Sequence, residues 1–225
     1  MFCVTSATAQ TSQAADADFP LLEIRAAEPG PTVALVAGIH GGKRAAVAAL
    51  RRLGRELPAE LRRGRVLILA PANARGFAAG LAQLSPDDSL NLNRVFPGAA
   101  DGRPTERLAA RILRDIVSQS DYLLDLHGSD GDEAVGRFAY AARPGFDARV
   151  DSAARQLAVA WGTPLVVWDQ DGPRSLETSR FLQTAAHLSR VPAITVFEAG
   201  ATRDDAAATT AFVAGSRAVL RTLRM

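Results

Sequence analysis

The chain of 225 residues is 48% hydrophobic, and its 26 lysine and arginine residues against 24 acidic residues give a formal net charge of +2. This composition favours a globular protein with one large core and indicates no nucleic-acid-binding surface. A single cysteine excludes an internal disulfide and a multi-cysteine metal site. No apolar run approaches the roughly 20 residues of a membrane helix, so we expect a cytoplasmic protein without a membrane partner.

The polar N-terminal stretch 1–17 is expected to be a disordered leader, and residues 18–225 are expected to form one domain. Short runs rich in Val, Ile and Leu then alternate with longer segments of helical period. This pattern predicts an α/β fold with a central, mostly parallel (mixed) sheet flanked by helices. The expected strands are 32–38, 65–71, 121–127, 164–168 and 193–200, and the expected helices include 44–57, 104–119 and 151–162. The long irregular segment 72–103 is expected to be functional.

Three of the expected strands end in a reactive side chain, namely His40, His127 and Glu198. The carboxyl ends of parallel strands are where ligand sites form in open sheets, so these three side chains are expected to converge. Asp125 precedes His127 by two positions and therefore points to the same side of its strand. We expect it either to orient that imidazole or to be an ordinary acid at a strand end.

Six motifs carry a resemblance to a known family. They are "GIHGG" (38–42), "NARGFAAG" (73–80), "LNRVFPG" (92–98), "TERLA" (105–109), "LLDLHGSDGDE" (123–133) and "PAITVFEAG" (192–200). In this order and spacing they resemble the succinylglutamate desuccinylase/aspartoacylase family, a branch of the zinc carboxypeptidase-like hydrolases. The resemblance implies a zinc-dependent deacylase that hydrolyses an amide bond in an N-acyl amino acid or a similar small-molecule carboxylate substrate.

The resemblance also implies roles for individual residues. His40 and His127 match two zinc ligands, and Glu198 matches the general base that acts beside a metal-bound water. Asn93 and Arg94 match the pair that binds the substrate carboxylate, a role that suits the planar guanidinium fork.

Three positions depart from the family pattern. Lys43 stands where the family has the glutamate zinc ligand, Asn91 stands where it has an aspartate, and an oxyanion-binding arginine is missing near Ala82 or Gln83. The first change leaves two protein ligands, fewer than the three of ordinary catalytic zinc sites, and adds a charge that repels the cation. The zinc site is therefore expected to be weak or absent.

Lys43 is the only lysine in the chain, and three explanations for it stay open. It points outward and zinc binds weakly, or its ammonium occupies the metal position, or it is an inactivating substitution. The alternatives to a zinc-dependent deacylase are accordingly a metal-free carboxylate-binding pseudoenzyme and a carboxypeptidase-like peptidase. Family members usually continue past the equivalent of residues 219–225 into a mainly β domain, which we expect to be missing here, so we expect a more open site.

Overall fold

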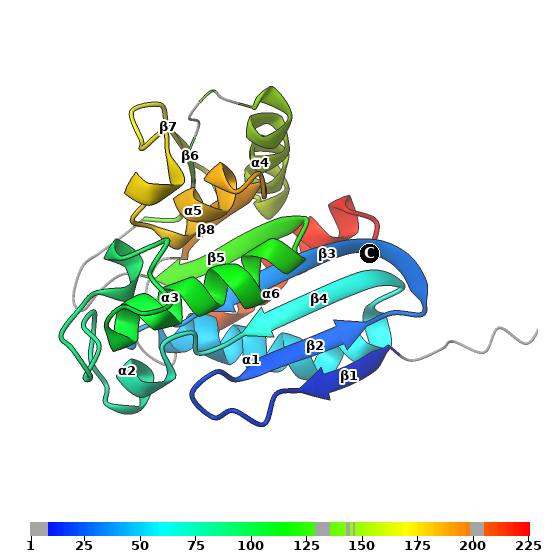
Figure 1. Cartoon of the computed structure of the whole chain (residues 1–225). Helices are drawn as coiled ribbons and strands as arrows, with labels where there is room; N and C mark the ends of the chain where they lie inside the picture. The colour runs from blue at the N-terminus through cyan, green and yellow to red at the C-terminus, as the bar shows by residue number, and fades with distance from the viewer. Residues whose placement is uncertain (1–8, 129–135, 143–144, 146, 199–204) are drawn as a thin grey trace, which may run out of the picture.

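The structure is a computed structural model that describes residues 9–128, 136–142, 145, 147–198 and 205–225. Its centre is a mixed sheet of eight strands in the order β1-β2-β4-β3-β5-β8-β6-β7 (Figure 1). The strands are β1 Gln10–Gln13, β2 Leu21–Arg25, β3 Glu28–Ala37, β4 Arg63–Leu69, β5 Tyr122–Gly128, β6 Phe138–Ala142, β7 Val166–Asp169 and β8 Ala193–Glu198. The four central strands β4, β3, β5 and β8 are parallel, so their carboxyl ends share one edge of the sheet.

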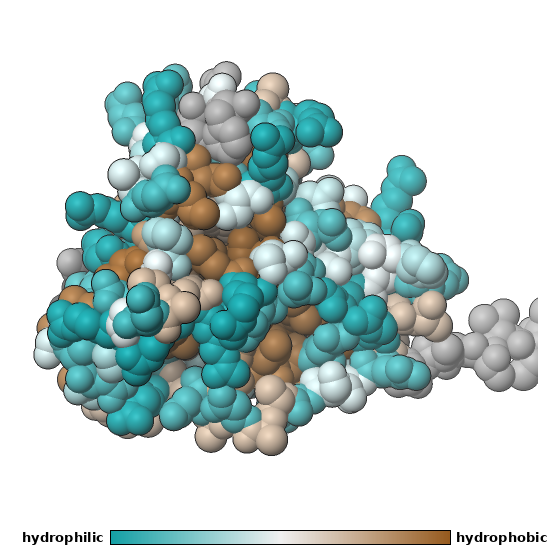
Figure 2. Space-filling view, in the orientation of Figure 1, coloured by the Kyte–Doolittle hydropathy of each residue, from teal (hydrophilic) through white to brown (hydrophobic). Residues whose placement is uncertain are grey.

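Helices cover both faces of the sheet (Figure 1). One face packs against α1 Arg44–Glu60, α4 Ala148–Trp161 and α6 Ala206–Thr222. The other face packs against α3 Pro104–Asp115 and α5 Leu182–Leu188. The short helix α2 Ala74–Ala78 and three 3-10 turns, η1 Leu92–Arg94, η2 Val117–Gln119 and η3 Leu176–Thr178, lie in the connections. Figure 2 shows hydrophobic residues gathered over α5, β8 and β5, on a face that is otherwise mostly hydrophilic.

The alternation of side chains along β5 and β8 decides which residues reach which layer. Leu124 and Leu126 of β5 belong to the core under α1, α4 and α6, together with Ile194 and Val196 of β8. Asp125 and His127 therefore point to the opposite side, towards α3 and α5. The two strands run in parallel register, with His127 beside Phe197 and Gly128 beside Glu198. Glu198 consequently points to the α1, α4 and α6 side.

The predicted α/β fold with a mixed sheet and flanking helices is confirmed, and each of the five expected strands is present. The strands β1, β2 and β6 were not expected. β1 has the polar sequence QTSQ and all four of its residues are exposed, so only its antiparallel pairing with β2 identifies it as a strand. It lies within the stretch 1–17 that was expected to be a disordered leader, of which residues 1–8 fall outside the described part. No helix in the described part of the chain is long and apolar enough to cross a membrane.

Candidate functional site

A cavity of about 400 Å³ opens where the central strands end, a size typical of small-molecule sites. Its charged and polar lining includes His40, His127, Asn93, Arg94, Tyr140 and Asp169. Its apolar wall is formed by Phe138, Phe181 and Phe197. Among the residues predicted from the sequence, the structure thus brings together both histidines and the Asn-Arg pair.

The two imidazoles lie side by side in this cavity. The ring centroids of His40 and His127 are 5.4 Å apart and the ring planes are nearly perpendicular, at 86°. His127 Nε2 lies 3.0 Å from the carboxylate of Asp125, and His40 Nε2 lies 3.1 Å from Asn91 Oδ1. An oxygen acceptor next to each Nε2 favours the tautomer in which Nε2 carries the proton and Nδ1 carries the lone pair. A nitrogen lone pair for a cation would therefore come from Nδ1 of each ring.

Asn91 orients His40 even though the sequence departs from the family at this position. Its Oδ1 atom lies against His40 and also accepts a hydrogen bond from the backbone N–H of Asn93, at 2.9 Å. A neutral amide oxygen supplies the same acceptor as a carboxylate oxygen, but without a negative charge. The substitution therefore keeps the geometry of His40 and removes charge that would stabilise a bound cation.

Lys43 lies inside the protein, with 2% of its surface exposed, at the residue that precedes α1. Its Nζ atom donates a hydrogen bond of 2.6 Å to the backbone oxygen of Gly128, the residue after His127. The turn that precedes Lys43 is closely packed, since a Cβ atom on Gly41 would lie 2.4 Å from the backbone oxygen of Leu81. Burial of the side chain disagrees with the explanation in which Lys43 points outward.

The donor set of the described residues is incomplete for a catalytic zinc ion. His40 and His127 fit as two ligands, because their Nε2 atoms are held and their rings are adjacent. The third position of the family holds the buried ammonium of Lys43, which cannot donate an electron pair while charged and repels a cation. No group of three or more His, Cys, Asp or Glu side chains that could hold a metal occurs among the residues described.

Glu198 does not line the cavity. It is 1% exposed, and its Oε1 atom accepts a hydrogen bond from the indole N–H of Trp161 at 3.0 Å. Its Oε2 atom accepts a hydrogen bond of 2.5 Å from Arg137 Nε, and this carboxylate raises the pKa of the Arg137 guanidinium. The physical reason for this placement is the strand alternation of β8, which turns Phe197 towards the cavity and Glu198 towards α4. The structure thus does not place Glu198 in the wall of the cavity that contains the two histidines.

Asn93 and Arg94 form part of the cavity wall at η1. Asn93 Oδ1 accepts a hydrogen bond of 2.9 Å from the backbone N–H of Leu182, which attaches η1 to the start of α5. Arg94 Nη1 donates to the backbone oxygen of Asn93 at 2.8 Å, and the guanidinium lies 4.8 Å from the centroid of the Phe181 ring. These contacts fix the guanidinium beside the cavity while leaving its remaining N–H groups available to a carboxylate.

Gln83 lies in the loop between α2 and η1 and is exposed. The neighbouring Ala82 approaches the glycine turn that carries His40, because a Cβ atom on Gly42 would lie 3.7 Å from Ala82 Cα. The loop in which the family arginine was missing is therefore adjacent to the candidate site. Neither Gln83 nor Ala82 lines the cavity.

Sequence reasoning missed the other end of the cavity, formed by β6 and β7. Tyr140 of β6 donates a hydrogen bond from its hydroxyl to Asp169 Oδ2, and burial, reinforced by this bond, raises the pKa of Tyr140 well above its ordinary value. The strand at 164–168 was expected, so the rule applied to the other strand ends would have selected Asp169. Tyr140 carried no comparable signal, because β6 itself was not expected.

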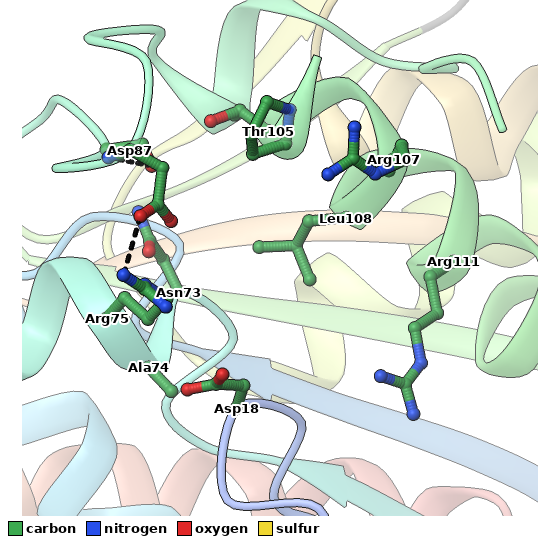
Figure 3. Close-up of a pocket in the computed structure, with 11 residues that line it drawn as sticks. Asp18, Asn73, Ala74, Arg75, Asp87, Thr105, Arg107, Leu108 and Arg111 are labelled. Atoms are coloured by element: carbon green, nitrogen blue, oxygen red, sulfur yellow. Dashed lines mark hydrogen bonds and ion pairs between the residues drawn. The ribbon is translucent and has the colours of Figure 1, made fainter. Parts of the chain in front are cut away.

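A second cavity, of about 230 Å³, lies between α2 and α3 (Figure 3). Arg107 and Arg111 project from α3 on one side of it, and Arg75 lies near Asp87 on the other, at 2.7 Å. Arg111 pairs with Asp16 as well. Two of the three arginines are thus paired with acidic side chains, and the two histidines are not among the residues that line this cavity. The candidate site is therefore the cavity at the strand ends.

The sequence is similar to a known family and to a characterised relative. The succinylglutamate desuccinylase/aspartoacylase catalytic domain matches residues 29–224. The N-alpha-acetyl-L-2,4-diaminobutyric acid deacetylase of Halomonas elongata is 38% identical over 138 residues, which is 61% of this chain and 40% of that protein. The match therefore spans less than half the length of this relative.

Solved structures show the same similarity. A succinylglutamate desuccinylase from Silicibacter sp. TM1040 superposes with a TM-score of 0.81 at 26% identity, over 92% of this chain and 60% of that one. The product-bound ectoine utilization protein EutE of Ruegeria pomeroyi gives 0.78 at 25% identity, over 96% and 71%. A metallo-carboxypeptidase from Burkholderia cenocepacia, at 15% identity and a TM-score of 0.73 over 96% and 65%, shares the fold. Because the family domain covers residues 29–224, this chain belongs to the succinylglutamate desuccinylase/aspartoacylase family and matches its catalytic domain.

Proposed function

We propose that this chain is the catalytic domain of a deacylase, an amide hydrolase for an N-acyl amino acid or a similar carboxylate-bearing small molecule, with a zinc site weakened by Lys43. The observation that carries the proposal is the cavity itself, which joins the adjacent imidazoles of His40 and His127 to the guanidinium of Arg94. A relative and a neighbour that are a deacetylase and a desuccinylase support the same class of reaction. The cytoplasm is the proposed location.

The substrate carboxylate is expected to bind at Arg94, because the remaining N–H groups of its guanidinium present a planar fork to the cavity. Stacking on Phe181 restrains the guanidinium, so less conformational entropy is lost when the ligand binds. Asn93 positions Arg94, because its backbone oxygen accepts a hydrogen bond from Arg94 and its side chain accepts one from Leu182 at the start of α5. These residues would hold the amide of the substrate near the two histidines.

The proposal treats zinc as a weakly bound ion. His40 and His127 would supply two nitrogen ligands, and Lys43 would lower the affinity by opposing a second positive charge. Glu198 is engaged by Trp161 and Arg137, so its use as a base would require it to leave these partners. Both features predict slow hydrolysis.

The test is to measure metal content and hydrolysis on the same purified protein. The chain is treated with a chelator, titrated with zinc, and assayed for release of acetate from N-acetyl amino acids, including N-acetyl-2,4-diaminobutyrate. We expect weak zinc binding and slow hydrolysis that rises with zinc and is lost in His127→Ala. Hydrolysis that does not depend on zinc or on His127 would contradict the proposal.

A second candidate function is metal-free binding of a carboxylate ligand. The observation that favours it is the buried ammonium of Lys43, which already places a positive charge next to the end of β5. The two candidates differ at saturating zinc. Carboxylate binding without any hydrolysis would support the binding protein and reject the deacylase.

A further inference from the structure

We propose that Asp169 forms a subsite for a positively charged substrate side chain, so that the domain prefers N-acyl amino acids whose side chain ends in an amine. This inference rests on the proposed function, since it assumes that the α-carboxylate of the substrate binds at Arg94. Asp169 is the last residue of β7 and lines the same cavity as Arg94. The cavity thus offers one anionic and one cationic group to a single ligand.

The carboxylate of Asp169 is held in place by two donors. Its Oδ2 atom accepts a hydrogen bond from the Tyr140 hydroxyl, and its Oδ1 atom accepts one of 3.0 Å from the backbone N–H of Asp171. Tyr140 also lines the cavity, and the high pKa of its buried phenol keeps the hydroxyl protonated as a donor. Each carboxylate oxygen retains acceptor capacity for a further donor. Asp169 is therefore preorganised to accept a hydrogen bond from an ammonium group.

The charge of Asp169 is not neutralised by a basic side chain of the described part of the chain. None of the lysine and arginine residues described there forms an ion pair with it, in contrast to Asp87, which pairs with Arg75. Arg94, which lines the same cavity, contacts the backbone oxygen of Asn93 and the ring of Phe181 instead of Asp169. An ammonium in the cavity would supply the missing opposite charge.

The aromatic wall favours the same ligand. The rings of Phe138 and Phe197 are stacked at 4.3 Å between centroids and line the cavity with Tyr140. Their faces carry negative charge density, so they attract a cation and its methylene stem but repel an anion. A second carboxylate on the substrate would meet Asp169 and these ring faces, which predicts discrimination against acidic side chains.

The experiment measures the binding of three ligands to the zinc-free chain by calorimetry. N-acetyl-L-2,4-diaminobutyrate carries the ammonium, N-acetyl-L-norvaline has the same shape with a methyl group in its place, and N-acetyl-L-aspartate carries a carboxylate. We expect the ammonium ligand to bind about 10- to 100-fold more tightly than the norvaline ligand, as a hydrogen bond between charged groups would give. The aspartate ligand should bind most weakly.

Variants assign the preference to Asp169. Asp169→Asn should abolish the preference while leaving the affinity for the norvaline ligand within about twofold. Asp171→Asn is the matched control, because it removes the same charge from an exposed neighbour that does not line the cavity, and it should keep the preference. Tyr140→Phe should reduce the preference in part, and its thermal unfolding, with that of Asp169→Asn, shows whether the variants remain folded.

The outcomes separate this inference from the proposed function. Equal binding of all three ligands, with loss of binding in Arg94→Ala, would overturn the Asp169 subsite and leave the carboxylate site standing. A preference for the ammonium ligand that survives in Asp169→Asn would also overturn it. If none of the ligands binds, both the subsite and the proposed function are rejected.

Discussion

His127 at the end of β5 and Glu198 at the end of the neighbouring strand β8 lie close along the sheet but have different surroundings. His127 faces the cavity, with Asp125 beneath it on the same side of the strand. Glu198, one step beyond the residue paired with His127, faces the opposite layer and is enclosed by Trp161 and Arg137. Closeness along two paired strands does not place side chains in one site, because successive residues point to opposite faces. His127 is therefore accessible to a ligand in the cavity, whereas the carboxylate of Glu198 is hydrogen-bonded to side chains of the protein.

The strongest way to test this difference is to restore an acidic residue on the histidine side. Lys43→Glu should raise the affinity for zinc by more than about 100-fold, because it adds a ligand and removes a repelling charge, and even outer partners of ligands change affinity 10- to 100-fold. Zinc titration calorimetry measures the change. Lys43→Gln is the control that removes the charge without adding a carboxylate, and it should gain much less. If the parent already binds one zinc ion tightly and Lys43→Glu gains nothing, Lys43 is not at the metal position.

The proposed binding of the substrate carboxylate by Arg94 predicts the next largest effect. Arg94→Ala should weaken the binding of an N-acetyl amino acid by about 10- to 100-fold, which corresponds to the loss of a hydrogen bond between charged groups. Arg52→Ala removes an arginine that pairs with Glu56 on α1 and serves as the control, with unchanged affinity expected. Equal affinities for Arg94→Ala and the parent would assign the segment 92–98 a purely structural role.

Removing a hydrogen-bond partner of the buried Glu198 should lower the stability of the protein. Trp161→Phe removes the indole N–H that binds Glu198 and leaves a buried carboxylate oxygen with one partner fewer. The free energy of unfolding should fall by about 1–3 kcal/mol, measured by urea denaturation. Arg137→Ala should cost less, because the Arg137 side chain is 46% exposed and solvent screens its ion pair. A larger loss from Arg137→Ala than from Trp161→Phe would show that the ion pair, and not the indole, holds Glu198.

His187, which does not line the cavity, is a buried histidine with a structural role. His187 on α5 is fully buried and lies 2.8 Å from Asp151 on α4, and burial lowers its pKa. The unfolded chain therefore takes up a proton at a higher pH than the folded protein does. Stability should fall as the pH drops from about 7 to 5, by less than about 1.4 kcal/mol per pH unit for one group.

The control for this pH effect is His187→Gln, in which the dependence between pH 7 and 5 should become flatter. The measurement is the free energy of unfolding from urea denaturation at each pH. An unchanged slope in the variant would exclude His187 as the titrating group.

The layered α/β fold and the strand ends at which side chains gather could be predicted from the order of residues alone. Runs of Val, Ile and Leu such as 32–38 and 121–127 require burial on both faces, which is the property of central parallel strands. The six motifs in order carried the family, and they selected the histidines and the Asn-Arg pair that the cavity brings together.

Placements that depend on neighbours distant in the sequence became visible only in the folded protein. The polar strand β1 exists because β2 pairs with it, and the partner of Glu198 on its side of β8 is Trp161, 37 positions away on α4. The burial of Lys43 depends on an acceptor 85 positions away, the backbone oxygen of Gly128. Local sequence sets the propensity of a segment for helix or strand. The partner of a charged side chain depends on tertiary packing between segments that are distant in the sequence.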